Sequence, residues 1–432
     1  MRNDEIVVLV TIDDLRADYC GFNGYRRDTT PFLDDFAAEN VVLEDHHAVA
    51  PSSPTSFRAI LSSTYPIQFD DYDHLSDDRP YIAELLSGAA VQTVGINSNP
   101  YLSRRFGFHR GFDTFIDFVS SGPEKQEHWA YRTAEKLSPR LRRGMKWLRE
   151  TVTEQLEARQ KYTRYSPPHA DAEEVNEKLR EQLEEVTAPA FIWVHYMEPH
   201  GPCIAPPPVL GRWTGYEKRW EAKQAYDQAM EDGDMETLID FYDETIRYVD
   251  REIENLVEML EERFGDDIHI ILTSDHGELF GEYGGKQGHP GDLNEILLNV
   301  PFILKSDREV ADRHLTSHLD IVPTVLDIFG IDPPEQLQGT SLFEDAEREY
   351  RISEAFPLQE DELVERDYDR HQVGVCTDDI LYVDGTENST VEDRDNPGTR
   401  TEGVREELAQ VAEEHRERHH AAFRQEIDDI DI

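Results

Sequence analysis

Three short runs of mostly apolar residues constrain the fold of this chain most, because each has the length of a strand and each is followed by acidic or histidine side chains. They are Ile6–Ile12, Phe191–His195 and Ile268–Thr273. A strand that is apolar on both sides is typical of a parallel strand covered by helices on its two faces. The runs therefore predict a central, mostly parallel sheet between two layers of helices.

Helical and strand patterns alternate between and around these runs. Thr30 and Pro31 are typical of a helix start, as N-cap and first helical residue, and Gly265 and Gly330 are typical of helix ends. The further helices expected are Pro80–Leu86, Asp240–Phe264 and Asp320–Phe329, and the further strands are Val41–Leu43, Gln92–Ile96 and Val300–Leu304. This alternation predicts a doubly wound α/β fold.

The chain divides into a large and a small part. We expect a catalytic domain over residues 1–345, interrupted by a polar, helical and solvated insertion at about 124–187. Beyond about Ser341 the pattern changes, and residues 346–432 are expected to form a small C-terminal α+β subdomain. It would contain an antiparallel hairpin within Val373–Val383 and a charged terminal helix over Glu402–Arg424.

The charge is strongly negative: 91 acidic residues against 43 basic ones give a formal net charge of -48. The acidic residues are spread along the chain, which indicates adaptation to a salt-filled cytoplasm and hence a halophilic source, because molar salt screens self-repulsion. Without a basic face, nucleic acid is excluded as a partner. No apolar run has the length of a membrane span or of a signal-peptide core, so we expect a cytoplasmic protein.

Acidic and histidine side chains cluster just after the predicted strands. Because the carboxyl ends of parallel strands share one edge of a sheet, clusters that are distant in sequence should converge there. They are Asp13 with Asp14, His195 with His200, and Asp275 with His276. Carboxylates and an imidazole suit a divalent metal. Each cluster alone has a simpler interpretation: a helix cap or turn for the acids, a core histidine for His195 and a solvated loop residue for His200.

Several motifs, in order along the chain, resemble those of the sulfatase family of the alkaline-phosphatase-like superfamily. They are Ile12–Asp18 with Gly21 and Gly24, Thr30–Asp34, Arg247–Asp250, Thr273–Glu278, Gly288–His289, Val300–Ile303, His318–Thr324 and Gly339–Leu342, and the loop His195–His200 matches the form His-x-x-x-Pro-His. The resemblance extends from Ile6 to about Leu342, and it is specific as a set. It implies an alkaline-phosphatase-like doubly wound fold and a metal-dependent hydrolase.

The resemblance also implies roles for single residues. Asp13, Asp14, Asp275 and His276 would hold one divalent metal ion, with Ca²⁺ favoured over Mg²⁺, Mn²⁺ or Zn²⁺. The histidines His195, His200 and His289 would contact the anionic group or protonate the leaving oxygen, with His195 on the substrate side and His200 and His289 as catalytic groups.

The nucleophile segment departs from the family pattern Cys-x-Pro-Ser-Arg, in which the first residue is oxidised to formylglycine. Aligning Ser56 and Ile60–Leu61 with the family places Ser53 at the nucleophile position, where it would also contact the metal, and leaves Thr55 and Phe57 in place of the family's proline and arginine. These changes argue against formylglycine at Ser53. Arg58, one position later, could still neutralise a bound anion. The simpler interpretation of Ser53 is a helix N-cap.

Three functions remain open on the sequence. The main hypothesis is a hydrolase of sulfate esters, acting on a small molecule or a glycan. An unmodified Ser53, activated by the metal, would instead suit a phosphate mono- or diester hydrolase or a phosphotransferase, because a phosphoserine is hydrolysed more readily than a sulfoserine. The altered nucleophile motif also leaves room for a catalytically silent protein that binds sulfated or phosphorylated glycans.

Overall fold

A seven-stranded sheet forms the centre of the computed structural model, which describes residues 4–69, 74–118, 169–355, 371–385, 389–399, 401–403 and 405–429. The strand order is β2-β10-β7-β1-β6-β4-β5. The strands are β1 (Ile6–Ile12), β2 (Val41–Val42), β4 (Gln92–Asn97), β5 (Thr114–Asp117), β6 (Ala190–Tyr196), β7 (His269–Ser274) and β10 (Phe302–Lys305). β7, β1, β6, β4 and β5 pair in parallel, whereas β10 is antiparallel to β7. The predicted doubly wound, mostly parallel sheet is confirmed.

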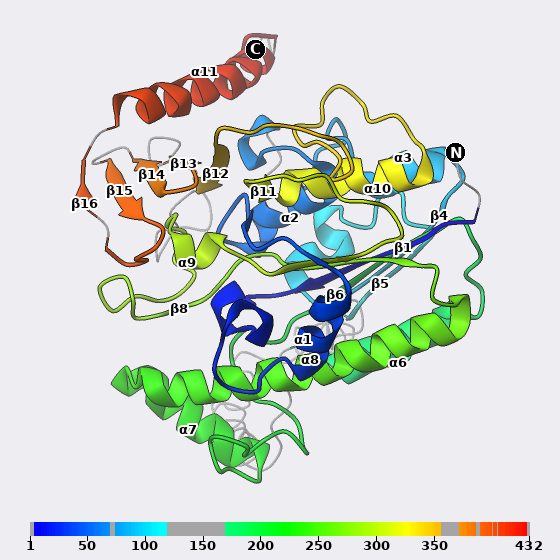
Figure 1. Ribbon diagram of the computed structural model, residues 1–432, viewed down its shortest axis with the longest axis vertical. Helices are drawn as coiled ribbons and strands as arrows, with labels where there is room; N and C mark the ends of the chain where they lie inside the picture. Colours follow the sequence, from blue (N-terminus) through cyan, green and yellow to red (C-terminus); the bar gives the residue numbers. More distant parts are fainter. Residues whose placement is uncertain are drawn as a thin grey trace, which may run out of the picture.

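Helices cover the sheet on both faces because successive residues of a strand point to opposite sides. Val8 and Val10 of β1 belong to the core beneath α6 (Ala172–Leu183) and α8 (Met235–Phe264), beside which lies α1 (Pro31–Glu39). Val7 and Leu9 face the opposite core, under α2 (Ser53–Ser62), α3 (Ile82–Gly88) and α10 (Ile321–Phe329). Figure 1 shows α6 and α8 on one side of the sheet and α2, α3 and α10 on the other.

The predicted insertion at about 124–187 lies mostly outside the described residues. Its last part, from residue 169, is described, and α6 within it is packed against the core rather than solvated. Helix α6 is not solvated on all sides: Ala172, Val175 and Leu179 are fully buried against the main core. Its apolar residues at helical spacing explain this, since such a stripe packs on a sheet whatever the charge of the opposite face. Helix α7 (Arg219–Asp232) lies outside α8 and was not expected.

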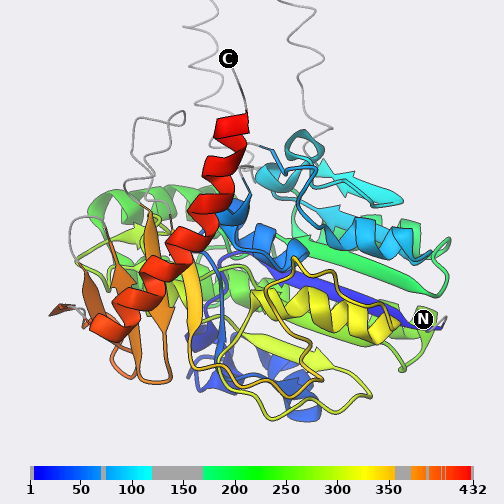
Figure 2. The same cartoon turned by 90° about the horizontal axis from the view of Figure 1, so that it is seen from above.

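The C-terminal part contains a five-stranded antiparallel sheet in the order β12-β13-β14-β15-β16. Its strands are β12 (Arg351–Ala355), β13 (Gln372–Cys376), β14 (Ile380–Asp384), β15 (Thr390–Asp393) and β16 (Thr401–Glu402). The predicted hairpin is β13–β14. The terminal helix α11 (Glu406–Asp429) lies across this sheet, as Figure 2 shows, with Ala412 packed among Val373, Val375 and Tyr382.

A partly buried network of ion pairs joins the two parts. Arg394, which follows β15, donates to a carboxylate oxygen of Glu295 at 3.0 Å and also contacts Asp45 and His47. Glu295 is the first residue of the short helix α9 (Glu295–Leu298). Arg351 of β12 donates to Asp45 at 2.8 Å. Among the described residues, no helix is both long enough and apolar enough to cross a membrane.

Candidate active site

The carboxyl ends of three neighbouring strands bring the predicted site residues together. In the parallel register Ile12 of β1 stands beside Tyr196 of β6 and beside Ser274 of β7. Asp13 and Asp275 therefore leave the sheet side by side, and His195 lies next to them. Asp14 has a φ of 63°, a left-handed conformation that aspartate adopts more readily than most residues and that is found at functional sites.

Ser53 lies at the amino end of α2, directly above this edge of the sheet. Its Oγ atom is 3.4 Å from each carboxylate oxygen of Asp13 and 3.4 Å from Nε2 of His276. Ser53 is the first residue of the helix, and Ser52 holds the N-cap position. The N-cap interpretation of Ser53 is therefore wrong, and its hydroxyl contacts Asp13 and His276 instead.

Two overlapping groups of metal-type donors lie at this edge of the sheet, and Ser53 contacts the first of them. The first consists of Asp13, Asp275 and His276, whose donor atoms lie within 4.8 Å of one another and whose side chains are buried. Oδ2 of Asp275 is buried and has no hydrogen-bond partner. Such a carboxylate oxygen costs free energy unless a cation satisfies it, so the donor set fits a divalent ion.

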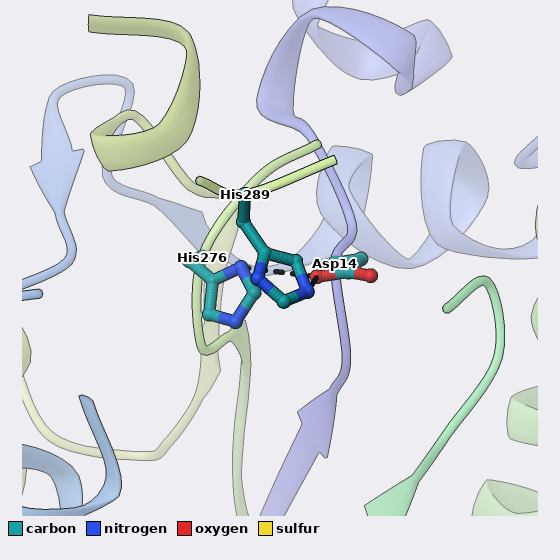
Figure 3. Close-up of side chains that lie close together, drawn as sticks. All are labelled: Asp14, His276 and His289. Carbon is teal, nitrogen blue, oxygen red and sulfur yellow. Dashed lines mark ion pairs between the residues drawn. The ribbon is translucent and has the colours of Figure 1, made fainter. Parts of the chain in front are cut away.

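The second group is centred on Asp14. Its Oδ1 lies 3.0 Å from Nδ1 of His276 and 3.8 Å from Nε2 of His289, and its Oδ2 lies 3.9 Å from Nε2 of His200. Figure 3 shows His276 and His289 converging on this carboxylate from two segments of the chain. The side chains of His200 and His289 are 32% and 30% exposed, so they form the open rim of the site.

The electrostatics of the cluster reflect crowded negative charge. Burial and the neighbouring Asp13 raise the pKa of Asp275 to about 6. Burial would also raise the pKa of Asp13, but the hydrogen bond with His195 and the nearby His200 hold it well below its ordinary value. Burial and the carboxylate of Asp14 raise the pKa of Glu278 well above its ordinary value. A bound cation would relieve this repulsion between carboxylates.

Two residues expected to contact the substrate are placed elsewhere. His195 is fully buried, and both ring nitrogens have protein partners, Asp13 at 3.2 Å and Thr11 at 3.0 Å. Arg58 is 3% exposed and donates to the carbonyl of Pro54 in its own helix. These contacts make His195 a support of Asp13, and they give no support to direct contact between Arg58 and a substrate.

The structure adds residues that sequence reasoning missed. Asn99, the N-cap of the 3₁₀ helix η4 (Pro100–Leu102), donates its Nδ2 to Oδ2 of Asp13 at 2.8 Å. Its position just after β4, on the same sheet edge as the other clusters, was the available signal. Glu278 interacts with Asp14, and its Oε2 is buried without a hydrogen-bond partner. His169 is near enough to interact electrostatically with His200 and Asp13, but it precedes α6 in the segment taken for an insertion.

This sheet, with an acidic and histidine cluster and a helix-terminal serine at its carboxyl edge, defines an enzyme fold of the alkaline-phosphatase-like superfamily. The chain belongs to the sulfatase family, whose model, described as "Sulfatase", matches residues 5–331. Enzymes of this family depend on a metal ion.

Relatives and solved structures agree with this assignment. An arylsulfatase of Clostridium perfringens is 23% identical over 383 residues, covering 78% of this chain and 77% of that protein. A putative extracellular sulfatase Sulf-1 homolog of Caenorhabditis elegans is 33% identical over 105 residues, but these cover 23% of this chain and only 15% of the relative. The chain therefore spans a small part of that protein's length.

Two solved structures share the fold over nearly the whole chain. A phosphonate monoester hydrolase from Silicibacter pomeroyi is 19% identical with a TM-score of 0.65, covering 97% of this chain and 95% of its own. A protein solved with its substrate D-glucosamine-2-N,6-O-disulfate is 17% identical with a TM-score of 0.67, covering 97% and 99%.

Proposed function

We propose that the protein is a metal-dependent hydrolase of sulfate esters and that sulfated sugars are its substrate class. The observation that carries the proposal is the position of Ser53, whose Oγ lies 3.4 Å from Asp13 and from His276 at the amino end of α2. Membership of the sulfatase family and the sulfatases among the relatives support sulfate as the ester group.

The residues divide the chemistry between them. Asp13, Asp275 and His276 would hold the metal ion, with Asp14 beside them. When bound, the ion favours the ionised form of a coordinated hydroxyl and offsets negative charge on the ester oxygens. The amino end of α2 places its positive dipole end and backbone N–H groups near the Ser53 oxygen, which stabilises an anion there. His200 and His289, on the exposed rim, would donate a proton to the departing oxygen.

We propose that Ser53 acts without modification and that Ca²⁺ is the preferred ion at Asp13 and Asp275. Phe57, which replaces the family's arginine, packs its ring 4.8 Å from His195 and 5.5 Å from Trp193. Ser53 would thus act as the nucleophile in a segment that lacks the family's usual arginine beside it. Peptide mass spectrometry of residues 50–58 tests the proposal, since formylglycine would lower the mass of Ser53 by two hydrogens and contradict it.

A phosphorus ester is the second candidate, favoured by the same unmodified serine and by the fold shared with a phosphonate monoester hydrolase. Turnover of matched aryl sulfate, aryl phosphate and aryl phosphonate esters by the metal-loaded protein separates the candidates. We expect the sulfate ester to have the highest kcat/KM. A preference for either phosphorus ester would replace the main proposal, and metal binding without any turnover would favour a silent glycan-binding protein.

We further propose a halophilic source and a cytoplasmic location, with a sulfated sugar or glycan precursor made inside the cell as substrate. The support is the net charge of -48 over the whole chain, which suits a medium where molar salt shortens the Debye length to about 3 Å. Fractionation of the native host tests the location, and recovery of the protein chiefly from the medium would contradict it.

A further inference from the structure

We propose that Tyr101 and Arg105 form a sugar-binding platform beside Ser53, on which the sugar ring of the substrate stacks against Tyr101 while a second anionic group of the same sugar binds Arg105. The inference rests on the proposed function, because it names the residues by which that site would recognise a sulfated sugar. Its test measures binding in the absence of turnover, so that it can fail or succeed independently of ester hydrolysis.

The first observation is the short connection between Tyr101 and the candidate site. The side-chain amide of Asn99 donates through Nδ2 to Oδ2 of Asp13 at 2.8 Å, and its Oδ1 accepts the backbone N–H of Tyr101 at 2.9 Å. Asn97 in turn accepts the backbone N–H of Asn99 at 2.9 Å and donates to the carbonyl oxygen of Leu102 at 3.1 Å. One amide group therefore joins Tyr101 to the carboxylate of Asp13, and the hydrogen bonds of two asparagines fix η4 in place.

The second observation is the exposure of the Tyr101 side chain. It is 55% exposed, more than any other large hydrophobic side chain in the described part of the chain. The next residue, Leu102, is fully buried in the core that Phe57 and Ile60 of α2 share. A single exposed aromatic ring is ordinary on a protein surface, but Tyr101 differs because Leu102 and Asn99 hold its backbone next to the site. Such a ring presents a flat apolar face at a low cost in conformational entropy.

The third observation is a neighbouring cation. The ring centroid of Phe106 lies 6.2 Å from that of Tyr101, and the guanidinium carbon of Arg105 lies 5.4 Å from the centroid of the Phe106 ring. Arg105 is exposed and has no ion-pair partner within the described ranges, although the chain contains 91 acidic residues against 43 basic ones. Its five N–H donors are therefore available to an anionic ligand.

These features identify the chemistry of the ligand. The C–H face of a sugar ring packs well on an exposed aromatic ring, because that ring combines apolar area with a negative π face. A guanidinium group matches the oxygen atoms of a sulfate by paired hydrogen bonds, as it does those of phosphate or carboxylate. With one sulfate ester at Ser53, the sugar ring would lie on Tyr101 and a second sulfate would reach Arg105. The sugar-binding platform therefore favours a sugar with two sulfate groups over a sugar with one.

The experiment measures affinities by calorimetry on the metal-loaded full chain with Ser53→Ala as the parent, so that no ester is turned over, in about 0.5 M KCl. The probes are inorganic sulfate, glucose 6-sulfate and glucose 3,6-disulfate. Tyr101→Ala should weaken the binding of glucose 6-sulfate about five- to tenfold and leave that of inorganic sulfate unchanged. Tyr101→Phe, which keeps the ring, should bind like the parent. Met230→Ala, at another exposed large hydrophobic residue, is the control and should change neither affinity.

A second variant tests the charged part of the platform. The parent should bind glucose 3,6-disulfate about threefold or more tightly than glucose 6-sulfate, and Arg105→Gln should remove this preference. The effect of Arg105→Gln should shrink when KCl is raised to about 2 M, because salt screens an exposed charge, whereas the effect of Tyr101→Ala should remain. Arg180→Gln, at an exposed arginine of α6, is the matched control.

The outcomes separate the platform from the proposed function. A parent that binds none of the probes, or that binds glucose 6-sulfate no more tightly than inorganic sulfate, would overturn the platform. Unchanged binding of glucose 6-sulfate by Tyr101→Ala, an equal loss of both ligands in that variant, or a disulfate preference that survives Arg105→Gln would overturn it as well. The expected pattern of binding, in a protein whose wild type hydrolyses no sulfate ester, would uphold the platform and overturn only the proposed function.

Discussion

The imidazole of His195 lies directly behind the carboxylate of Asp13, with Nε2 3.2 Å from Oδ2. Asn99 donates to the same oxygen at 2.8 Å, and Thr11, which receives the indole N–H of Trp193 at 3.0 Å, contacts the other ring nitrogen of His195. Because these partners converge on Oδ2, lone pairs of Oδ1 remain available for a cation. Buried side chains therefore fix the orientation of a metal-type carboxylate.

Removing one of these supports should weaken metal binding without unfolding the protein. Asn99→Ala deletes one donor to Asp13 and is expected to lower the affinity for the metal ion by 10- to 100-fold, as loss of an outer partner of a ligand usually does. Calorimetric titration with Ca²⁺ measures this. Asn40→Ala, which deletes a hydrogen bond to Phe36 outside the site, should leave the affinity unchanged, and an equal loss in both variants would contradict the assigned role.

The ion pairs of Arg394 should contribute much of the free energy that holds the C-terminal sheet against the main domain. Arg394→Ala leaves the carboxylate of Glu295, which is 4% exposed, without its guanidinium partner, and breaking a buried pair in this way costs about 3–5 kcal/mol. Urea unfolding in high salt measures the change, with Arg418→Ala at an exposed position as the control. Arg394→Lys should recover only part of the loss, since lysine lacks the fork of donors.

Acid should destabilise the protein partly through Glu295. Burial would raise its pKa, but the attraction of His47 and the hydrogen bonds with His47 and Arg394 lower it to about 2 from an ordinary 4.5. A lowered carboxyl pKa stabilises the fold above the unfolded value, and this stabilisation, about 3 kcal/mol, is lost as the pH falls from 4.5 towards 2. Between roughly pH 5 and pH 3, Glu295→Gln should therefore lose less stability than wild type, and parallel curves would refute the assignment.

Salt should stabilise the folded chain. With 91 acidic and 43 basic residues, self-repulsion opposes the compact state and is screened as salt rises. We expect the Tm to increase by several degrees between about 0.1 M and 2 M KCl, measured by circular dichroism. Since the effect is general screening, NaCl should act almost as well as KCl. A Tm that is flat or falls over this range would contradict the proposed halophilic adaptation.

Much of the fold could be predicted from periodicity and turn residues. The fully apolar strand at Ile6–Ile12 and the helical stripe ending at Phe264 appear in the structure as β1 and α8. The antiparallel direction of β10 could not be predicted from the sequence, because a buried strand has the same apolar pattern in either direction. We expected α6 to be exposed to solvent because most of its residues are charged. Its few apolar residues, among them Val175 and Leu179, are nevertheless buried against the sheet.

The candidate site followed from one topological rule, that strand ends of a parallel sheet meet. This rule predicted that Asp13, Asp275 and His276 lie together, as they do. The position of Ser53 beside them came from the resemblance to the family instead. The rule does not predict the orientation of a side chain. It therefore could not show that His195 contacts the carboxylate of Asp13 rather than a substrate. Asn99 was missed for a related reason, since an asparagine after a strand also serves as an ordinary helix cap.

The central claim is that Ser53 is the nucleophile of a metal-dependent sulfate ester hydrolase, and the most direct measurement is turnover of an aryl sulfate by wild type and Ser53→Ala, both loaded with the same metal in high salt. The account predicts turnover by wild type and a loss of kcat of at least about 10³-fold in the variant, with the Tm nearly unchanged. Equal turnover by the two proteins would contradict it.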